Sequence, residues 1–72
     1  MSAVLYTIAG CTHCDAKRAE LVAAGVTIRE IDVDREPQAI PELLKLTRGR
    51  RIVPVIVREG RIEIAPDGGS NF

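Results

Sequence analysis

Apolar and polar positions alternate along the chain in blocks that predict strands and helices in turn. Residues 3–8 form a short apolar run rich in strand-favouring side chains, typical of a strand buried on both faces. Residues 12–24 are rich in Ala, Lys, Arg, Glu and Leu, which favour a helix, and Gly25 follows where a left-handed cap is needed. Residues 26–33 then predict a second strand, so the first three elements form a right-handed parallel βαβ unit.

A second helix is predicted to run to Thr47 and to end at Gly49. Asp34 is a candidate N-cap for it, whereas Pro41, which fits only the first turn of a helix, favours a start near Ile40. The positions that share one face of this helix are Ile40, Leu43, Leu44 and Thr47.

Two further strands are predicted over residues 53–57 and 61–65. Glu59-Gly60 joins them as a tight turn, which makes an antiparallel hairpin, and residues 66–72 have the composition of turns. The order strand, helix, strand, helix, strand, strand predicts an α/β fold with a four-stranded mixed sheet. A chain of 72 residues is long enough for only one domain, which is expected to span residues 1–72.

Charge and composition exclude several classes of protein. Ten Lys and Arg balance ten Asp and Glu, whereas a nucleic-acid-binding domain is usually basic. Tyr6 and Phe72 are the two aromatic residues, too few for a base-stacking platform. The sequence has neither an apolar run of about 20 residues nor a secretory signal pattern, so we expect no membrane span and a cytoplasmic protein.

The two cysteines of the chain, Cys11 and Cys14, form one C-x-x-C, which indicates thiol chemistry or metal binding. Cys11 falls at the predicted N-terminus of a helix, where unpaired N–H groups and the helix dipole favour a thiolate and lower its pKa. We therefore expect Cys11 to be an exposed nucleophile and Cys14, one turn later, to be a buried resolving thiol. The alternative is a pair of unreactive buried thiols.

His13 lies between the cysteines, either as a cation that lowers the pKa of Cys11 further or as an exposed polar residue of the turn. It is the only histidine, so one chain cannot supply the four ligands of a structural zinc site, and no metal is expected. An iron–sulfur cluster carrier that borrows thiols from a second chain or from glutathione, or a redox-sensing domain, stays open as a non-enzymatic alternative.

These residues resemble the glutaredoxins of the thioredoxin superfamily over nearly the whole chain. The similar segments are Tyr6-Thr7 with Cys11-Thr12-His13-Cys14, Ile31-Asp32-Val33-Asp34, Val53-Pro54 and Gly68-Gly69-Ser70. The resemblance implies a thioredoxin-like fold and a thiol–disulfide oxidoreductase. Such an enzyme reduces glutathione mixed disulfides or protein disulfides without a bound cofactor, with glutathione as co-substrate.

The resemblance also implies a binding site around the thiols. Val53-Pro54 would be a cis peptide facing them, which leaves the Val53 backbone free to pair with an extended peptide such as glutathione. The segment Gly68-Gly69-Ser70 would grip glutathione, beside Thr12 and His13. The alternative for Pro54 is an ordinary trans proline at a strand start.

Arg51 is a candidate ligand for a carboxylate of glutathione or of an acidic partner, and Arg48 and Arg50 are weaker candidates. The alternative for all three is a solvated helix end, where cations suit the dipole.

Three departures from the family pattern concern glutathione. Ile8 replaces a common Lys, Ile52 replaces a Thr, and Thr12-His13 replaces the usual Pro-Tyr, so each change removes a glutathione contact. The loss of the Lys and of the Thr favours an alternative in which thioredoxin reductase recycles the protein and it donates electrons to one partner, such as ribonucleotide reductase, whereas the Gly68-Gly69-Ser70 turn favours glutathione. The usual last helix of the family is also lacking, which predicts exposed apolar surface beside the first helix and a homodimer.

Overall fold

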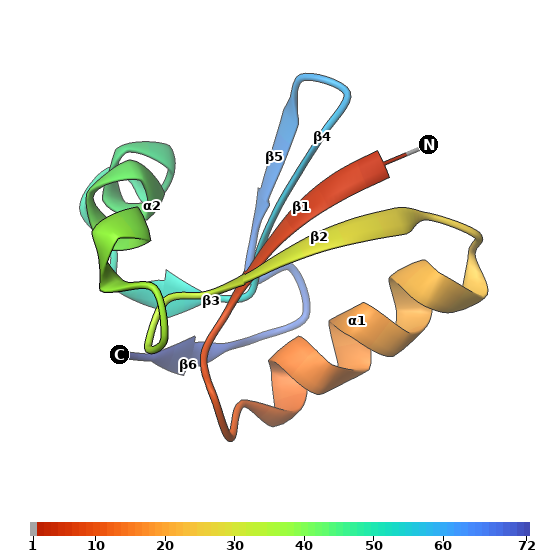
Figure 1. The fold of residues 1–72 in the computed structure, drawn as a ribbon, viewed down its shortest axis with the longest axis horizontal. Coiled ribbons are helices and arrows are strands. Elements are labelled where there is room, and N and C mark those ends of the chain that lie inside the picture. The colour runs from red at the N-terminus through yellow and green to blue at the C-terminus, as the bar shows by residue number, and fades with distance from the viewer. Residues whose placement is uncertain (1) are drawn as a thin grey trace.

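The computed structural model describes residues 2–72, and Met1, the first residue of the expected domain, lies outside the described residues. The elements in chain order are β1 (Ser2–Thr7), α1 (Thr12–Ala23), β2 (Thr27–Asp32), the 3-10 helix η1 (Pro37–Ala39), α2 (Ile40–Thr47), β3 (Ile52–Val53), β4 (Val55–Arg58), β5 (Arg61–Ile64) and β6 (Ser70–Asn71) (Figure 1). The α/β class and the predicted order of strands and helices are confirmed.

The main sheet has four strands in the order β2-β1-β4-β5. β1 and β2 are parallel and joined through α1, and β4 runs antiparallel to both β1 and β5, so the sheet is mixed as predicted. The turn of the β4–β5 hairpin is Glu59-Gly60, with φ of 50° and 75°. Positive φ at both central residues is typical of the tight hairpin turn whose twist matches that of the strands.

β6 was not expected, because residues 66–72 carry no strand pattern. The predicted strand over residues 53–57 is interrupted at Pro54, and its first part, β3, pairs antiparallel with β6 in a separate two-stranded sheet. Proline has no backbone N–H to donate, which divides the strand at this position. The edge of β3 is then filled by a segment distant in the sequence, and the prediction that residues 66–72 form only turns is wrong.

The second helix begins at Ile40 and has Pro41 in its first turn, which confirms the start predicted from the position of the proline. The prediction that Asp34 caps this helix is wrong, because η1 and a turn intervene. Within that turn Asp32 Oδ1 accepts a hydrogen bond of 2.9 Å from the N–H of Asp34, which stabilises the turn locally. The helix ends at Thr47 as predicted, and its C-cap residue is Arg48, which is left-handed with a φ of 58° and directly precedes Gly49.

Each face of the main sheet packs against one helix. α1 contributes Leu21 to a cluster with Leu5 and Ile56, whereas α2 contributes Leu43 to a cluster with Tyr6, Val55 and both cysteines. Side chains alternate along a strand, which explains why the neighbours Leu5 and Tyr6 belong to different clusters. Within residues 2–72, no helix has the length and apolar character needed to cross a membrane.

Candidate functional site

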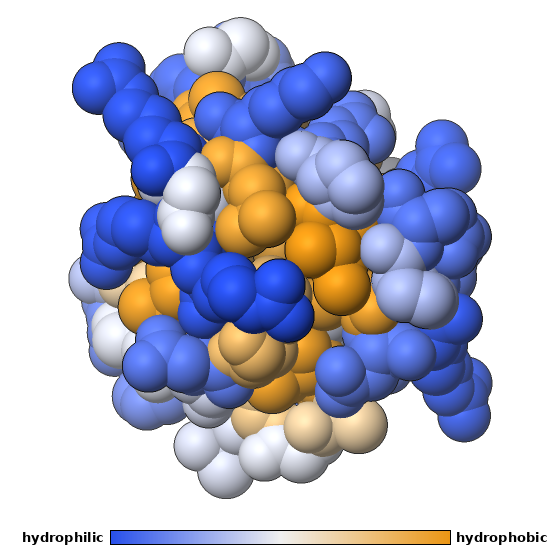
Figure 2. Space-filling view, turned by 90° about the vertical axis from the view of Figure 1, so that its left-hand side faces the viewer, coloured by the Kyte–Doolittle hydropathy of each residue, from blue (hydrophilic) through white to orange (hydrophobic). Residues whose placement is uncertain are grey.

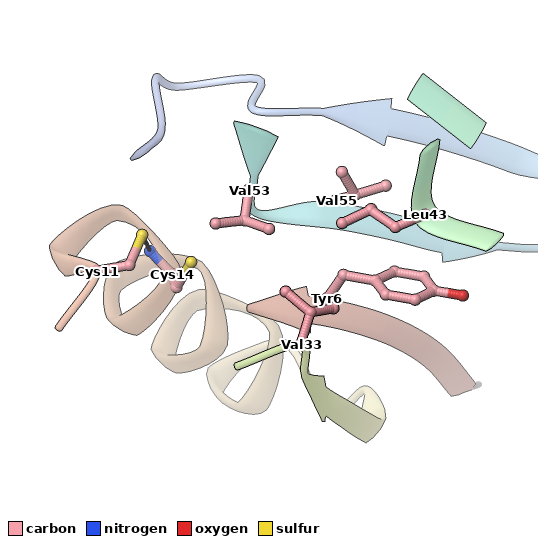
Figure 3. Packing of buried hydrophobic residues seen from close by; sticks show 7 residues of the cluster. All are labelled: Tyr6, Cys11, Cys14, Val33, Leu43, Val53 and Val55. Carbon is pink, nitrogen blue, oxygen red and sulfur yellow. Dashed lines mark hydrogen bonds between the residues drawn. The ribbon is translucent and has the colours of Figure 1, made fainter. Parts of the chain in front are cut away.

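Cys11 lies in the turn between β1 and α1 and is the N-cap residue of that helix. Its backbone is extended, with φ −90° and ψ 109°, so the side chain folds back over the first helical turn. The backbone N–H of Cys14 donates a hydrogen bond of 3.1 Å to Cys11 Sγ (Figure 3). The sulfur therefore sits at the positive end of a three-turn helix, where an anion is stabilised.

Burial raises the pKa of the Cys11 thiol, but hydrogen bonds to the sulfur outweigh this effect and hold the pKa below its ordinary value. The donors are the Cys14 thiol, the Ser70 hydroxyl and the backbone N–H groups of Cys14 and His13. The expected depression of the pKa is thus confirmed. His13 contributes through its backbone, and Ser70 is a donor that the helix position of Cys11 does not predict.

Cys14 has the opposite character. Burial, the hydrogen bond from its thiol to Cys11 and the negative charge of Cys11 together raise the pKa of Cys14 to about 12. Its residue is 0% exposed. The structure contains both cysteines as free thiols, so Cys14 is held as a protonated donor while Cys11 is held as the acceptor.

The prediction that Cys11 is exposed is wrong, because the residue is only 1% exposed. It belongs to the same buried cluster as Val53, and Figure 3 shows Val53 beside the two thiols. The segment that pairs with Val53 brings Ser70 close to the sulfur of Cys11. The burial of Cys11 thus goes together with a long-range pairing, of which the position of Cys11 in its own helix gives no sign.

The peptide bond between Val53 and Pro54 is cis, and both residues are buried. The family resemblance implied this geometry, and the alternative of a trans proline is excluded. The expected free backbone at Val53 is contradicted, because Val53 pairs with Ser70 in the antiparallel β3–β6 sheet. The edge predicted to receive a peptide is therefore occupied by the protein's own chain.

The backbone of Gly68 and Gly69 packs closely against His13 and Val53. A Cβ on Gly68 would lie 3.1 Å from Cε1 of His13, and one on Gly69 would lie 2.0 Å from the carbonyl oxygen of Val53. Gly68 also has a φ of +101°, which other residues rarely adopt. These two glycines pack on His13 and Val53 of the protein itself, and their part in binding glutathione stays a prediction.

The arginines and Thr12 have exposed side chains. Thr12 begins α1 and is exposed, as are Arg48 and Arg50. Arg51 Nε donates a hydrogen bond of 2.8 Å to the Phe72 carbonyl oxygen, and its guanidinium lies 4.7 Å from the centroid of the Phe72 ring. Arg51 is therefore engaged with the segment that carries β6.

Lys17 and Asp67 form an ion pair that the sequence reasoning missed. Lys17 Nζ lies 2.8 Å from Asp67 Oδ2 and 2.6 Å from Glu20 Oε2, so α1 is joined to the turn that precedes Gly68. The two carboxylates raise the pKa of Lys17. A signal was present: position 17 is one helical turn after the buried Cys14, and a lysine on a buried helix face usually has a partner.

Among residues 2–72, no three His, Cys, Asp or Glu side chains are grouped so that they could hold a metal ion. The site itself consists of two sulfurs and the hydrogen-bond donors around Cys11. This arrangement provides one stabilised thiolate with a second, protonated thiol behind it, which is what two-step exchange with an external disulfide requires.

Comparison with known proteins agrees with this geometry. The model of the family described as Glutaredoxin matches residues 3–62. Among solved structures, the chain is similar to the glutaredoxin-like protein NrdH-redoxin from Escherichia coli, with a TM-score of 0.76 and 28% sequence identity. The match covers 96% of this chain and 83% of the other, and that protein is described as having a thioredoxin-like activity profile. No curated protein matches the sequence.

Proposed function

The chain belongs to the glutaredoxin family of thiol–disulfide oxidoreductases, and from this premise we propose that Cys11 is its nucleophile and Cys14 its resolving thiol. The observation that carries the assignment is the hydrogen bond of 3.1 Å from the Cys14 N–H to Cys11 Sγ. It stabilises the anionic form of the first sulfur, whereas the second sulfur has a pKa raised to about 12.

In the first step, the Cys11 thiolate attacks one sulfur of a substrate disulfide. A bond forms between Cys11 and that sulfur, the substrate S–S bond breaks, and the departing thiolate takes a proton from solvent. The products are a mixed disulfide on Cys11 and one reduced substrate thiol.

In the second step, Cys14 loses its proton to solvent, from which the departing substrate thiolate later takes one up, and the Cys14 thiolate attacks Cys11 Sγ. The Cys11–Cys14 disulfide forms, the mixed disulfide breaks, and the second substrate thiol leaves, so two electrons have passed to the substrate. Burial and the anion of Cys11 are what raise the pKa of Cys14. Once Cys11 is in a mixed disulfide its charge is gone, so the pKa of Cys14 falls when its thiolate is needed.

Protein disulfides and glutathione mixed disulfides are both substrates for this chemistry. We place the bound disulfide against the first turn of α1 and the cis-proline loop. The residues proposed to contact it are Thr12, His13, Arg51, Val53, Pro54, Gly68, Gly69 and Ser70.

A thioredoxin-reductase-type flavoprotein is the reductant that we favour over glutathione. Ile8 and Ile52 replace polar family residues that contact glutathione, and Val53 and Gly69 are packed against each other. The similarity to a protein with a thioredoxin-like activity profile supports the same choice. Because such recycling belongs to reducing compartments, we place the protein in the cytoplasm, in electron transport and redox homeostasis.

Recycling assays test this proposal. Oxidised protein is offered NADPH with thioredoxin reductase, or NADPH with glutathione and glutathione reductase, and NADPH consumption is followed with a disulfide substrate present. We expect turnover with the first system, little with the second, and none in a Cys14→Ser variant. Faster turnover with glutathione would reverse the choice of reductant, and turnover with neither system would contradict the electron-carrier function.

A further inference from the structure

The nucleophilic sulfur is covered by the protein's own chain. Disulfide exchange needs a substrate sulfur to approach Cys11 Sγ directly, yet Cys11 is only 1% exposed. Residues 70–72, called the covering segment here, pair with β3 and place Ser70 beside Cys11. The reaction therefore requires a movement that uncovers the sulfur.

The covering segment also uses the backbone groups that a substrate would need. The N–H of Phe72 donates a hydrogen bond of 3.3 Å to the carbonyl oxygen of Arg51. Along an antiparallel ladder, hydrogen-bonded residue pairs alternate with pairs that are not hydrogen-bonded. Val53 lies two residues after Arg51 and Ser70 two residues before Phe72, so Val53 and Ser70 form the next hydrogen-bonded pair. Both polar backbone groups of Val53 then face Ser70, which leaves none of them for an incoming peptide.

The contacts that hold the covering segment lie at the surface. β6 has only two residues, and Arg51, which binds the carbonyl and the ring of Phe72, is exposed. The ion pair between Lys17 and Asp67 fixes the preceding turn, and the Asp67 side chain is 75% exposed. Contacts of this kind are weak in water, so the segment can separate from β3 while the main sheet stays intact.

We propose that the covering segment is a displaceable strand that selects extended polypeptide disulfides over small ones. An extended substrate backbone takes the place of Ser70 opposite Val53, which replaces the lost hydrogen bonds and uncovers Cys11 in the same event. A small disulfide without a peptide backbone cannot replace those bonds, so it reacts only during spontaneous opening. This inference rests on the proposed dithiol exchange, whose bonds and electrons it leaves unchanged.

The first test compares the Arg51→Ala variant with wild type and with Arg61→Ala, a matched control on β5. Iodoacetamide labelling of Cys11 is followed by mass spectrometry at a pH where the rate no longer rises, so that only exposure limits it. Loss of the Arg51 contacts is expected to speed labelling about three- to tenfold, and Arg61→Ala is expected to label like wild type. Equal rates in all three proteins would overturn the proposal.

The second arm measures selectivity in a single turnover. Each reduced protein is mixed with hydroxyethyl disulfide, or with a peptide whose disulfide-bonded cysteine lies in an extended segment, and the oxidised fraction is read after acid quenching. Arg51→Ala should accelerate the small disulfide more than the peptide, whereas an unchanged ratio of rates would contradict selection. If neither disulfide oxidises any form, the dithiol function fails, but the labelling arm still decides whether the segment opens.

Two further measurements guard against a misfolded variant. In Gly69→Ala the new Cβ would lie 2.0 Å from the Val53 carbonyl oxygen, so the segment cannot dock and labelling should again accelerate. In the wild-type protein, hydrogen exchange by NMR should show the amides of Ser70 and Phe72 exchanging faster than those of β4. Protection as strong as that of β4 would show that the segment does not open separately, and would overturn the proposal.

Discussion

At the scale of single residues, the two cysteines differ through hydrogen bonding. Cys11 and Cys14 are 1% and 0% exposed, so burial alone would raise the pKa of both thiols. Cys11 accepts hydrogen bonds and its pKa is lowered, whereas Cys14 donates to Cys11 and its pKa rises to about 12. The direction of the hydrogen bonds around the two sulfurs therefore decides which thiol has the lowered pKa.

A Ser70→Ala variant tests the donor that comes from outside the helix. Removing the hydroxyl takes away one hydrogen bond to the thiolate, so we expect the pKa of Cys11 to rise. The thiolate absorbance in the ultraviolet, followed against pH, measures it, with Ser2→Ala as a control at the far end of β1. A midpoint that does not move would exclude Ser70 as a stabilising donor.

The sequence predicts one half of this electrostatic arrangement. The neighbouring sequence predicts that Cys11 precedes a helix, because Gly10 ends the strand and helix-forming residues follow. The contribution of Ser70 and the burial of Cys11 depend on a pairing between distant segments, which no local pattern encodes. The position of Lys17 on a buried helix face indicates that it needs an acidic partner, but the sequence does not identify that partner as Asp67.

At the scale of elements, the periodic segments could be predicted and the shortest strands could not. The strands of the main sheet and α2 follow apolar patterns, whereas α1 follows a run of helix-forming residues. The observed ends of these elements mostly lie within two residues of the predicted ends. β3 and β6 have two residues each and are too short to show a period. Their pairing arises because Pro54 divides the strand and leaves the edge of β3 to be filled.

α2 depends on one fully buried large side chain. Leu43 is 0% exposed and packs with Tyr6 and Val55, so a Leu43→Ala variant leaves a cavity beneath the helix. We expect the free energy of unfolding to fall by about 2–5 kcal/mol, measured by urea denaturation, with the exposed Lys45→Ala as control. A loss as small as that of the control would mean that α2 is not anchored through this residue.

At the scale of the whole molecule, apolar surface is distributed differently from expectation. On the sheet face beside α1, Ala3, Leu5 and Ile56 are buried, at most 4% exposed. Among the described residues, the exposed large apolar side chains are Val22 on α1, 61% exposed, and Ile62 on β5, 47% exposed. Figure 2 shows a further apolar area ringed by polar side chains on the side that carries α2 and the β3–β6 pair.

The homodimer stays a prediction, and it now rests on these limited areas. With a net charge of zero, two copies do not repel each other strongly at neutral pH. Sedimentation velocity over a range of concentrations tests it. Association appears as a mass that rises from the 7.8 kDa of one chain toward twice that value, and a mass independent of concentration contradicts it.

The most direct test of the account is the pH dependence of alkylation at each cysteine of the wild-type protein. The pKa of Cys11 is lowered, so its thiolate persists to lower pH than an ordinary thiol, and the pKa of Cys14 is about 12. We predict that iodoacetamide labels Cys11 with a midpoint below that of free cysteine, while Cys14 stays unlabelled through neutral pH. Labelling of Cys14 first, or a Cys11 midpoint at or above that of free cysteine, would contradict the assignment of the nucleophile.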